Sequence, residues 1–337
     1  MDWLKVSPNI YRYSLLDKNV LPYSVNIYLI VGNSEAIFID CGYESPHFKQ
    51  AIMDALLYFQ LQPSNCKLLI THIHIDHCGN ADFCYEQGME IILNPIERTA
   101  SGKSTRISKD TALLCGVDES NFYEYEHQTL QENRPIPGSR LPYKMLDKNI
   151  PYTPINIGDK LTISDYNFDV YAFAGHSPAH LCLHDIDKGV VFSGDLIVLG
   201  TVPVVLSTMA DQQMLTKYLK TLDFLNKIKS KVFFPGHCET LRKEFSEPEL
   251  AINTIKNDYN MLLNRLNEWI IEDASAKTVV QMAARLYKCS ESTYLDSKHD
   301  AKTVMLMKIL SCLEHLHETG RIQRFLEHNT AYYRVFL

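Results

Sequence analysis

The chain has 337 residues, of which 46% are hydrophobic, a net charge of −7 and a sequence pI of about 6.0. This composition is typical of a globular protein with a buried core, and it does not point to a polyanionic partner. No stretch approaches about 18 uninterrupted apolar residues, and the N-terminus lacks the basic and apolar regions of a signal peptide. The nine cysteines form no CxxC pair, so we expect reduced thiols in a cytoplasmic protein without a membrane partner.

The first two thirds of the chain predict an α/β domain in which short strands alternate with helices. Apolar runs at 25–31 and 36–42 flank a short polar segment, a spacing that predicts a β-hairpin. Ser45 is a typical helix N-cap, and helical periodicity follows it. Further strands are predicted at 67–73, 90–95, 160–175, 181–195 and 231–237, and an amphipathic helix, capped by Asp211, at 211–229.

The periodic pattern is lost in a polar segment at about 101–154, which contains five prolines. A loop of that length inside a domain is usually functional or disordered. We interpret it as an insertion that acts either as a lid over a pocket or as a surface decoration.

The last part of the chain has a helical pattern at 249–274, 276–287 and 300–320, and two strands follow within 322–336. This order is that of a winged helix. We therefore place a boundary near Glu247, between a catalytic domain (1–246) and a winged-helix-like C-terminal domain (247–337). Residues 246–337 carry 11 Lys and Arg against 12 Asp and Glu, whereas a surface that binds nucleic acid should be basic.

A dense cluster of titratable side chains follows the predicted strand at 67–73. In the sequence THIHIDH, an extended backbone would point His72, His74 and Asp76 the same way, while His77 would face a second point nearby. Imidazole and carboxylate groups are ligands that zinc prefers. The cluster therefore predicts a metal site rather than a polar loop.

Three more candidate ligands lie where later predicted strands end. Each follows a short apolar run and a glycine, which allows the backbone to turn sharply. If several strands deliver side chains to one edge of a sheet, these residues complete a site for two ions: His176, Asp195 and His237.

In order, HxHxDH, GHxxxH, a Gly–Asp and a final Gly–His resemble the metallo-β-lactamase superfamily, over about residues 25–239. The resemblance is to its glyoxalase II-like and lactamase-β-like 2 branches, the second of which carries a winged-helix domain. It implies a four-layer αββα sandwich with a two-metal site at one edge. By the same resemblance His72, His74 and His176 bind the first metal, Asp76, His77 and His237 bind the second, Asp195 bridges them, Asp40 supports the site without binding metal, and His180 is structural.

The expected chemistry is hydrolysis by a hydroxide that two divalent metal ions generate from water at working pH. Asp76 is the expected catalytic residue, which orients the water and shuttles its proton. Zinc is the favoured metal, and iron and manganese are the alternatives. Superfamily members with redox di-iron sites resemble HxExDH, with a carboxylate at the position of His74, whereas iron-dependent dioxygenase relatives also have histidines here.

The substrate is less well specified. The sequence GHSPAH resembles the GHTPGH pattern of glyoxalase II-like thioesterases and lactonases, and the apolar run at 196–207 suits either an acyl-binding wall or plain packing. We expect a hydrolase of a small ester, thioester or lactone, with a small-molecule acyl substrate and a homodimer as the default assembly. A metal-dependent endoribonuclease and a ligand-sensing regulatory protein on the same fold are the alternatives.

Overall fold

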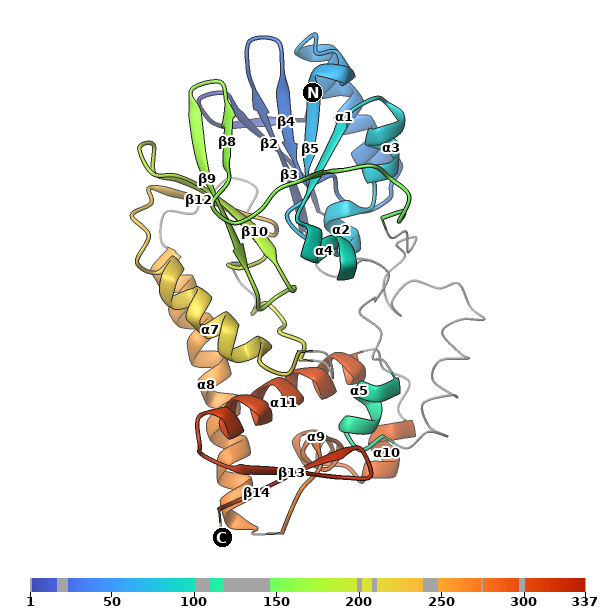
Figure 1. Ribbon diagram of the computed structural model, residues 1–337, viewed down its shortest axis with the longest axis vertical. Helices are drawn as coiled ribbons and strands as arrows, with labels where there is room; N and C mark the ends of the chain where they lie inside the picture. The colour runs from blue at the N-terminus through green and yellow to red at the C-terminus, as the bar shows by residue number, and fades with distance from the viewer. Residues whose placement is uncertain are drawn as a thin grey trace.

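Two β-sheets face each other at one end of the molecule, and a helical region lies at the other end (Figure 1). The computed structural model describes residues 2–16, 24–100, 109–117, 146–198, 202–207, 211–238, 248–273, 275–296 and 301–336.

The first sheet contains seven strands in chain order. The hairpin predicted from the runs at 25–31 and 36–42 is present as an antiparallel pair, and the next three neighbours pair in parallel. The strands are β1 (Leu4–Ser7), β2 (Ile10–Leu16), β3 (Ser24–Val31), β4 (Ala36–Ile39), β5 (Cys66–Leu69), β6 (Glu90–Leu93) and β7 (Thr153–Pro154).

The second sheet contains five strands in the order β12-β11-β10-β9-β8. Strands β9, β11 and β12 run in the same direction, because β10 is antiparallel to both of its neighbours and β12 is parallel to β11. Their C-terminal ends therefore meet at one edge of the sheet. The strands are β8 (Lys160–Ile163), β9 (Tyr166–Phe173), β10 (His180–Asp185), β11 (Val190–Gly194) and β12 (Val232–Pro235).

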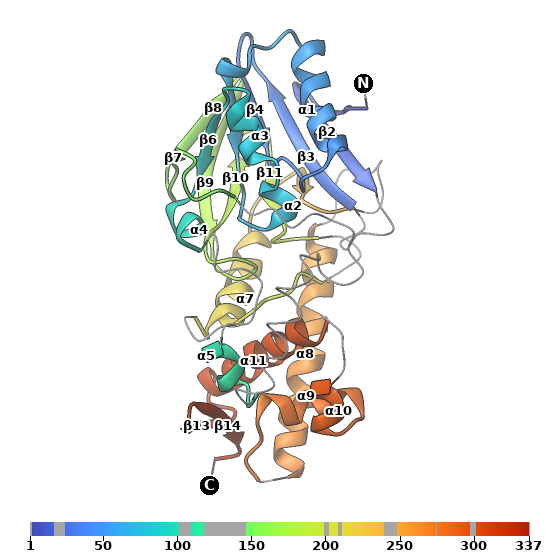
Figure 2. The ribbon, with the colours of Figure 1, turned by 90° about the vertical axis from the view of Figure 1, so that its right-hand side faces the viewer.

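Helices cover the outer faces of both sheets, so the predicted αββα sandwich is confirmed (Figure 2). Ser45 caps α1 as predicted, since its hydroxyl accepts a hydrogen bond from the Phe48 amide at 3.3 Å. Asp211 does not cap α7, which begins three residues later. The helices of the sandwich are α1 (Pro46–Tyr58), α2 (Ile75–Cys78), α3 (Ala81–Glu86), α4 (Pro95–Ala100) and α7 (Met214–Leu225), with one 3-10 turn, η1 (Pro63–Asn65).

The C-terminal region contains the three predicted helices, the predicted hairpin and one additional short helix, α10. A capping box of Thr278 and Gln281 begins the second of these helices. The predicted boundary near Glu247 lies outside the described residues. The elements are α8 (Pro248–Glu272), α9 (Val279–Tyr287), α10 (Glu291–Asp296), α11 (Ala301–Glu318), β13 (Gln323–Glu327) and β14 (Thr330–Arg334).

Part of the segment predicted as an insertion belongs to the helical region. Within 101–154, residues 109–117 and 146–154 are described, and the first of these forms α5 (Lys109–Leu114) beside α11 in both views (Figures 1 and 2). The backbone carbonyl of Cys115 accepts a hydrogen bond from the Val280 amide at 3.0 Å, and Leu114 is fully buried. This part of the segment is therefore a packed helix, and not a surface loop.

One apolar core joins the outer face of the second sheet to the C-terminal helices. It contains Cys182 and Val191 of the sheet, Tyr218 of α7, Tyr259 of α8 and Leu310 of α11. Burial against this shared core stabilises both regions together. Among the described helices, none has the length and apolarity that crossing a membrane requires.

Candidate metal centre

The seven side chains predicted as ligands come together at one edge of the sandwich, in two neighbouring groups. This is the edge that faces the helical region, where α2 and α4 lie (Figure 1). His72 and His74 lie in the loop after β5, Asp76 and His77 in α2, His176 after β9, Asp195 after β11 and His237 after β12.

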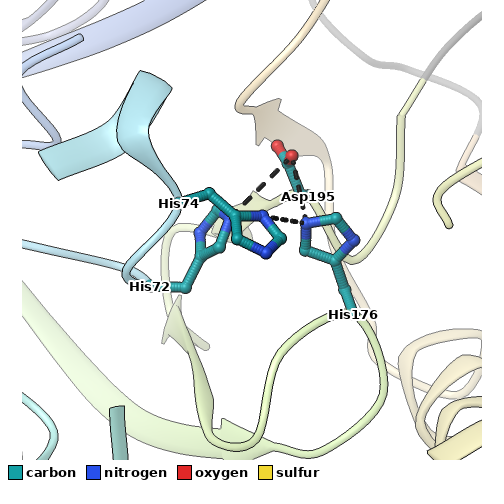
Figure 3. Close-up of side chains that lie close together, drawn as sticks. All are labelled: His72, His74, His176 and Asp195. Atoms are coloured by element: carbon teal, nitrogen blue, oxygen red, sulfur yellow. Dashed lines mark hydrogen bonds and ion pairs between the residues drawn. The ribbon is translucent and has the colours of Figure 1, made fainter. Parts of the chain in front are cut away.

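The first group contains His72, His74, His176 and Asp195, whose candidate ligand atoms all lie within 4.8 Å of one another (Figure 3). The Nδ1 atom of His74 lies 2.9 Å from Nε2 of His72 and 2.9 Å from Nε2 of His176. Asp195 Oδ2 lies 3.4 Å from Nε2 of His176. An imidazole nitrogen offers one lone pair or one proton, so Nδ1 of His74 cannot form a good hydrogen bond with both of these neighbours. Donor atoms arranged around one point are instead the geometry in which proteins bind a four-coordinate cation.

The second group contains Asp76, His77 and His237, again with their candidate ligand atoms within 4.8 Å. Asp195 reaches this group too, because its Oδ1 lies 3.4 Å from His77 Nε2 and its Oδ2 lies 3.0 Å from His237 Nε2. One carboxylate therefore lies between the two groups, in the position expected of a bridging ligand.

The backbone of the HxHxDH motif differs from the extended chain that the sequence suggested. Only the stretch up to His74 is non-helical, and Asp76 and His77 lie in the helical turn α2. Successive side chains of a helix point about 100° apart. Both residues can therefore contribute to the second group from consecutive positions.

Two glycines are required by the close packing of this edge. Gly194 adopts a φ of 47°, and a Cβ atom there would lie 2.4 Å from Cε1 of His180. A Cβ atom on Gly236 would lie 2.3 Å from Oδ1 of Asp195. A side chain at Gly236 would displace the proposed ligand Asp195, and one at Gly194 would displace His180, which holds the Asp195 amide, so both positions require glycine.

Asp40 holds two of the histidines without entering either group. Its Oδ2 accepts a hydrogen bond from His77 Nδ1 at 2.7 Å and another from the Thr71 hydroxyl at 2.9 Å. The Thr71 hydroxyl in turn lies 3.0 Å from Nδ1 of His72. Asp40 itself has a φ of 62°, a conformation that non-glycine residues rarely adopt and that is common at functional sites.

Backbone carbonyls hold two further histidines in the same way. Nδ1 of His176 donates to the carbonyl of Val204 at 3.2 Å, and Nδ1 of His237 donates to the carbonyl of Ser24. Together with Asp40 and the Thr71 hydroxyl, these acceptors hold a proton on Nδ1 of four histidines, so that Nε2 of each faces the site. Outer partners of this kind orient metal-binding histidines in proteins.

The electrostatics of the two groups also suit cations. Burial lowers the pKa of His72, His74 and His176, which keeps these imidazoles neutral and able to act as ligands. Burial also opposes a charge on His237, but Asp195 and Asp76 outweigh it and raise its pKa to about 10.

One buried carboxylate oxygen has no hydrogen bond in the described part of the chain, namely Oδ1 of Asp195. His77 Nε2 lies 3.4 Å away as an ion-pair partner without forming a hydrogen bond, and a bound cation would satisfy this buried anionic oxygen more fully. The donor types, their convergence and this oxygen together fit a pair of divalent cations.

Glu97 of α4 belongs to the site's framework, although no motif indicated it. Its side chain is fully buried, and one oxygen accepts hydrogen bonds from the Ser177 hydroxyl and the Ala179 amide, both at 2.6 Å. The other oxygen accepts from the Ile73 amide at 3.2 Å. Glu97 therefore joins the loop of His72 and His74 to the loop of His176.

His180 has a structural geometry. Its Nδ1 donates to the carbonyl of Leu181 at 2.8 Å, and its Nε2 accepts from the Asp195 amide at 3.1 Å. Its ring stacks on that of His72 with centroids 4.5 Å apart, and burial lowers its pKa to about 3. The Nδ1 contact thus fixes the orientation of the ring, and Nε2 holds the backbone of Asp195 at the end of β11.

Comparison with known proteins agrees with this fold. The family model of the metallo-beta-lactamase superfamily matches residues 20–237. The protein belongs to this superfamily. Its relatives include the bovine acyl-coenzyme A thioesterase MBLAC2, which is 24% identical over 229 residues, 65% of this chain and 75% of the relative. The Drosophila melanogaster beta-lactamase-like protein 2 homolog is 25% identical over 262 residues, 76% of this chain and 73% of the relative.

Solved structures of this superfamily share the architecture of nearly the whole chain. A beta-lactamase domain protein from Burkholderia ambifaria has a TM-score of 0.77 at 18% identity, over 99% of this chain and 94% of that structure. The metallo-beta-lactamase family protein TTHA1429 from Thermus thermophilus has a TM-score of 0.70 at 19% identity, over 98% and 100%. The C-terminal helices are therefore part of a fold that other members of the superfamily share.

Proposed function

We propose that this superfamily hydrolase cleaves a small acyl thioester, ester or lactone with the help of two divalent cations. The observation that carries the proposal is the position of Asp195, whose two oxygens face the two groups of converging donors. The proposed ligands are His72, His74 and His176 for one cation, Asp76, His77 and His237 for the other, and Asp195 for both.

A pair of divalent cations would supply a Lewis acid for the acyl oxygen and would bring the pKa of water toward neutrality. Asp76 is the proposed catalytic residue. Burial favours its protonated form, but His77 and His237 outweigh burial and lower its pKa, so the carboxylate accepts hydrogen bonds and orients water. The water oxygen attacks the acyl carbon, the bond to sulfur or oxygen breaks, and Asp76 relays the proton to the leaving group.

The exposure of the ligands indicates the side from which a substrate approaches. His74, Asp76 and His176 are partly exposed, whereas His72 and His77 are fully buried. The segment whose carbonyl holds His176 is apolar: Val204 is half-buried, and the half-buried Val202 and Leu206 also pack against the core shared with the C-terminal helices. Such a surface suits an acyl chain, and a thioester substrate agrees with the name of the bovine relative.

Further assignments belong to the same proposal. We favour zinc, a cytoplasmic location and a homodimer. We expect no nucleic-acid partner, because the net charge of the C-terminal region is close to zero. We also favour a division into a catalytic domain (1–246) and a winged-helix-like domain (247–337), because helices followed by a hairpin have that order.

A direct test combines elemental analysis with a substrate panel. The purified protein, reconstituted with zinc, manganese or iron, is assayed against acyl thioesters of increasing chain length, lactones and single-stranded RNA. We expect two cations per chain and thioester or ester turnover that His72→Ala abolishes. Cleavage of RNA that is lost in His72→Ala, with thioesters left intact, would replace this proposal by a ribonuclease.

A further inference from the structure

The segment 202–207 connects the metal centre to the helical region. Its side chains alternate, with Pro203, Val205 and Ser207 buried and the intervening residues partly exposed, as in an extended chain. The Val204 carbonyl accepts the hydrogen bond from His176 Nδ1 at 3.2 Å. The position of the Val204 carbonyl therefore affects the ring orientation of His176, one of the proposed ligands.

Tyr259 of α8 holds the backbone on both sides of Val204. Its hydroxyl accepts a hydrogen bond from the Val205 amide at 3.0 Å and donates one to the Pro203 carbonyl at 2.8 Å. The side chain is fully buried. Tyr259 thus holds the peptide unit that carries the Val204 carbonyl, through its Val205 amide, and the preceding peptide unit, through the Pro203 carbonyl.

Ser311 of α11 adds a second, independent attachment. Its hydroxyl oxygen accepts from the Ser207 amide at 2.7 Å and lies 3.0 Å from the Val205 carbonyl. The segment belongs to neither sheet, so its buried polar groups need partners from elsewhere. Side chains of the C-terminal helices supply them.

A second buried tyrosine performs a related task from α7. The hydroxyl of Tyr218 donates to the carbonyl of Leu196, the residue after Asp195, at 2.8 Å. The rings of Tyr218 and Tyr259 lie 6.2 Å apart at 72°, in an edge-to-face arrangement. From one shared packing unit, Tyr218 therefore braces the chain directly after Asp195, and Tyr259 braces the segment whose carbonyl holds His176.

We infer that Tyr259 is a positioning residue of the metal centre, which acts through the Val204 carbonyl on the ring orientation and tautomer of His176. With the Nδ1 proton fixed on this carbonyl, the Nε2 lone pair faces His74 and Asp195. The C-terminal helical region is then a working part of the site's support. This inference rests on the proposed function, because it requires His176 to bind a cation.

The test compares two conservative variants of the full-length protein. Tyr259→Phe removes the clamping hydroxyl and keeps the ring. Tyr166→Phe is the matched control, because Tyr166 is equally buried but its hydroxyl donates to the Pro8 carbonyl, outside the metal centre. Chelator competition measures the number of bound cations and the dissociation constant of each, and crystal structures of the loaded proteins give the distance from His176 Nδ1 to the Val204 carbonyl.

We expect Tyr259→Phe to weaken the affinity for the cation bound by His176 by about 10-fold, which is the lower end of the effect for outer partners of metal-binding histidines. The affinity for the other cation should stay within about twofold of its original value. The distance at His176 should lengthen, and Tyr166→Phe should change neither quantity. Ser311→Ala should shift the same cation in the same direction, and it serves as the test if Tyr259→Phe does not fold.

Two outcomes would overturn the inference in different ways. If Tyr259→Phe binds both cations as the unmodified protein does, Tyr259 is only a packing residue and the proposed function stands. If the unmodified protein binds no cation after reconstitution, the proposed function fails and this inference fails with it.

Discussion

The edge of the sandwich and the C-terminal helical region use buried polar groups in opposite ways. At the edge, histidine nitrogens that face one another lie as close as 2.9 Å, and a buried carboxylate oxygen of Asp195 has no hydrogen bond in the described structure. In the helical region, the buried acid Glu314 is paired with Arg324 and Tyr333. The first arrangement is incomplete until something binds, whereas in the second both oxygens of the acid accept hydrogen bonds within the protein itself.

This difference predicts where mutations act. Proteins tolerate locally unfavourable groups at functional sites and compensate for them elsewhere in the structure. Changes at the edge should therefore reduce activity more than stability, and changes in the helical region should do the reverse.

The largest effect is expected at the exposed side of the metal centre. His74→Ala should lower turnover by about 10³-fold or more, the scale on which a member of a catalytic constellation acts. The free energy of unfolding of the cation-free protein should change by less than about 1 kcal/mol, because His74 is partly exposed. Steady-state kinetics and urea denaturation measure the two quantities, with the exposed His47→Ala as a control. Retention of most of the activity would remove His74 from the proposed site.

A cavity made by mutation in the helical region should lower the free energy of unfolding much more than it lowers turnover. Leu266 of α8 is fully buried, and Leu266→Ala should lower the free energy of unfolding by about 3 kcal/mol. At temperatures well below unfolding, kcat should stay within about twofold, because Leu266 lies about two helical turns from Tyr259. Thermal unfolding and kinetics on the same sample check both values. A large loss of kcat in the folded variant would show that the two regions are coupled more broadly than through the segment 202–207.

Glu97 should affect both properties, since it joins two ligand loops from a buried position. Glu97→Ala leaves three donors without their acceptor, and we expect a loss of about 2 kcal/mol in the free energy of unfolding. Cation binding should weaken by about 10-fold, because both ligand loops lose an anchor. Chemical denaturation and chelator competition measure these effects, and the exposed Glu90→Gln is the control. Unchanged cation affinity would limit Glu97 to a role in folding.

The smallest effect concerns pH and the paired acid of the helical region. Burial raises the pKa of Glu314 above its usual value of 4.5, and Tyr333 and Arg324 only partly oppose this. A carboxyl with a raised pKa contributes stability that is present below pH 4.5 and is lost as the pH rises through the pKa of the folded state. The stability of the unmodified protein relative to Glu314→Gln should therefore fall between pH 4 and 7. Denaturation curves across this range measure it, and a rising difference would contradict the sign.

The residues of the metal centre could be predicted because each lies in a short local pattern. Ligands that follow the ends of successive strands need only the strand pattern and the adjacent glycines to be recognised, as for Asp195 and His237. Glu97 was missed, because an isolated glutamate in a short helix has no spacing that distinguishes it from a surface residue. The helix α5 was missed for a related reason, since its burial comes from contacts with segments far along the chain.

The amino-acid sequence by itself determined the strands, the helices and the identity of the converging side chains, because hydrophobic period and ligand spacing are local properties. The two-sheet architecture followed from the resemblance of its motifs to the metallo-β-lactamase superfamily. Only the tertiary structure decided what holds those side chains in place. The Val204 carbonyl, the hydroxyl of Tyr259 and the carboxylate of Glu97 act across long sequence distances, and hydrogen bonds of that kind depend on packing and leave no periodic trace in the chain.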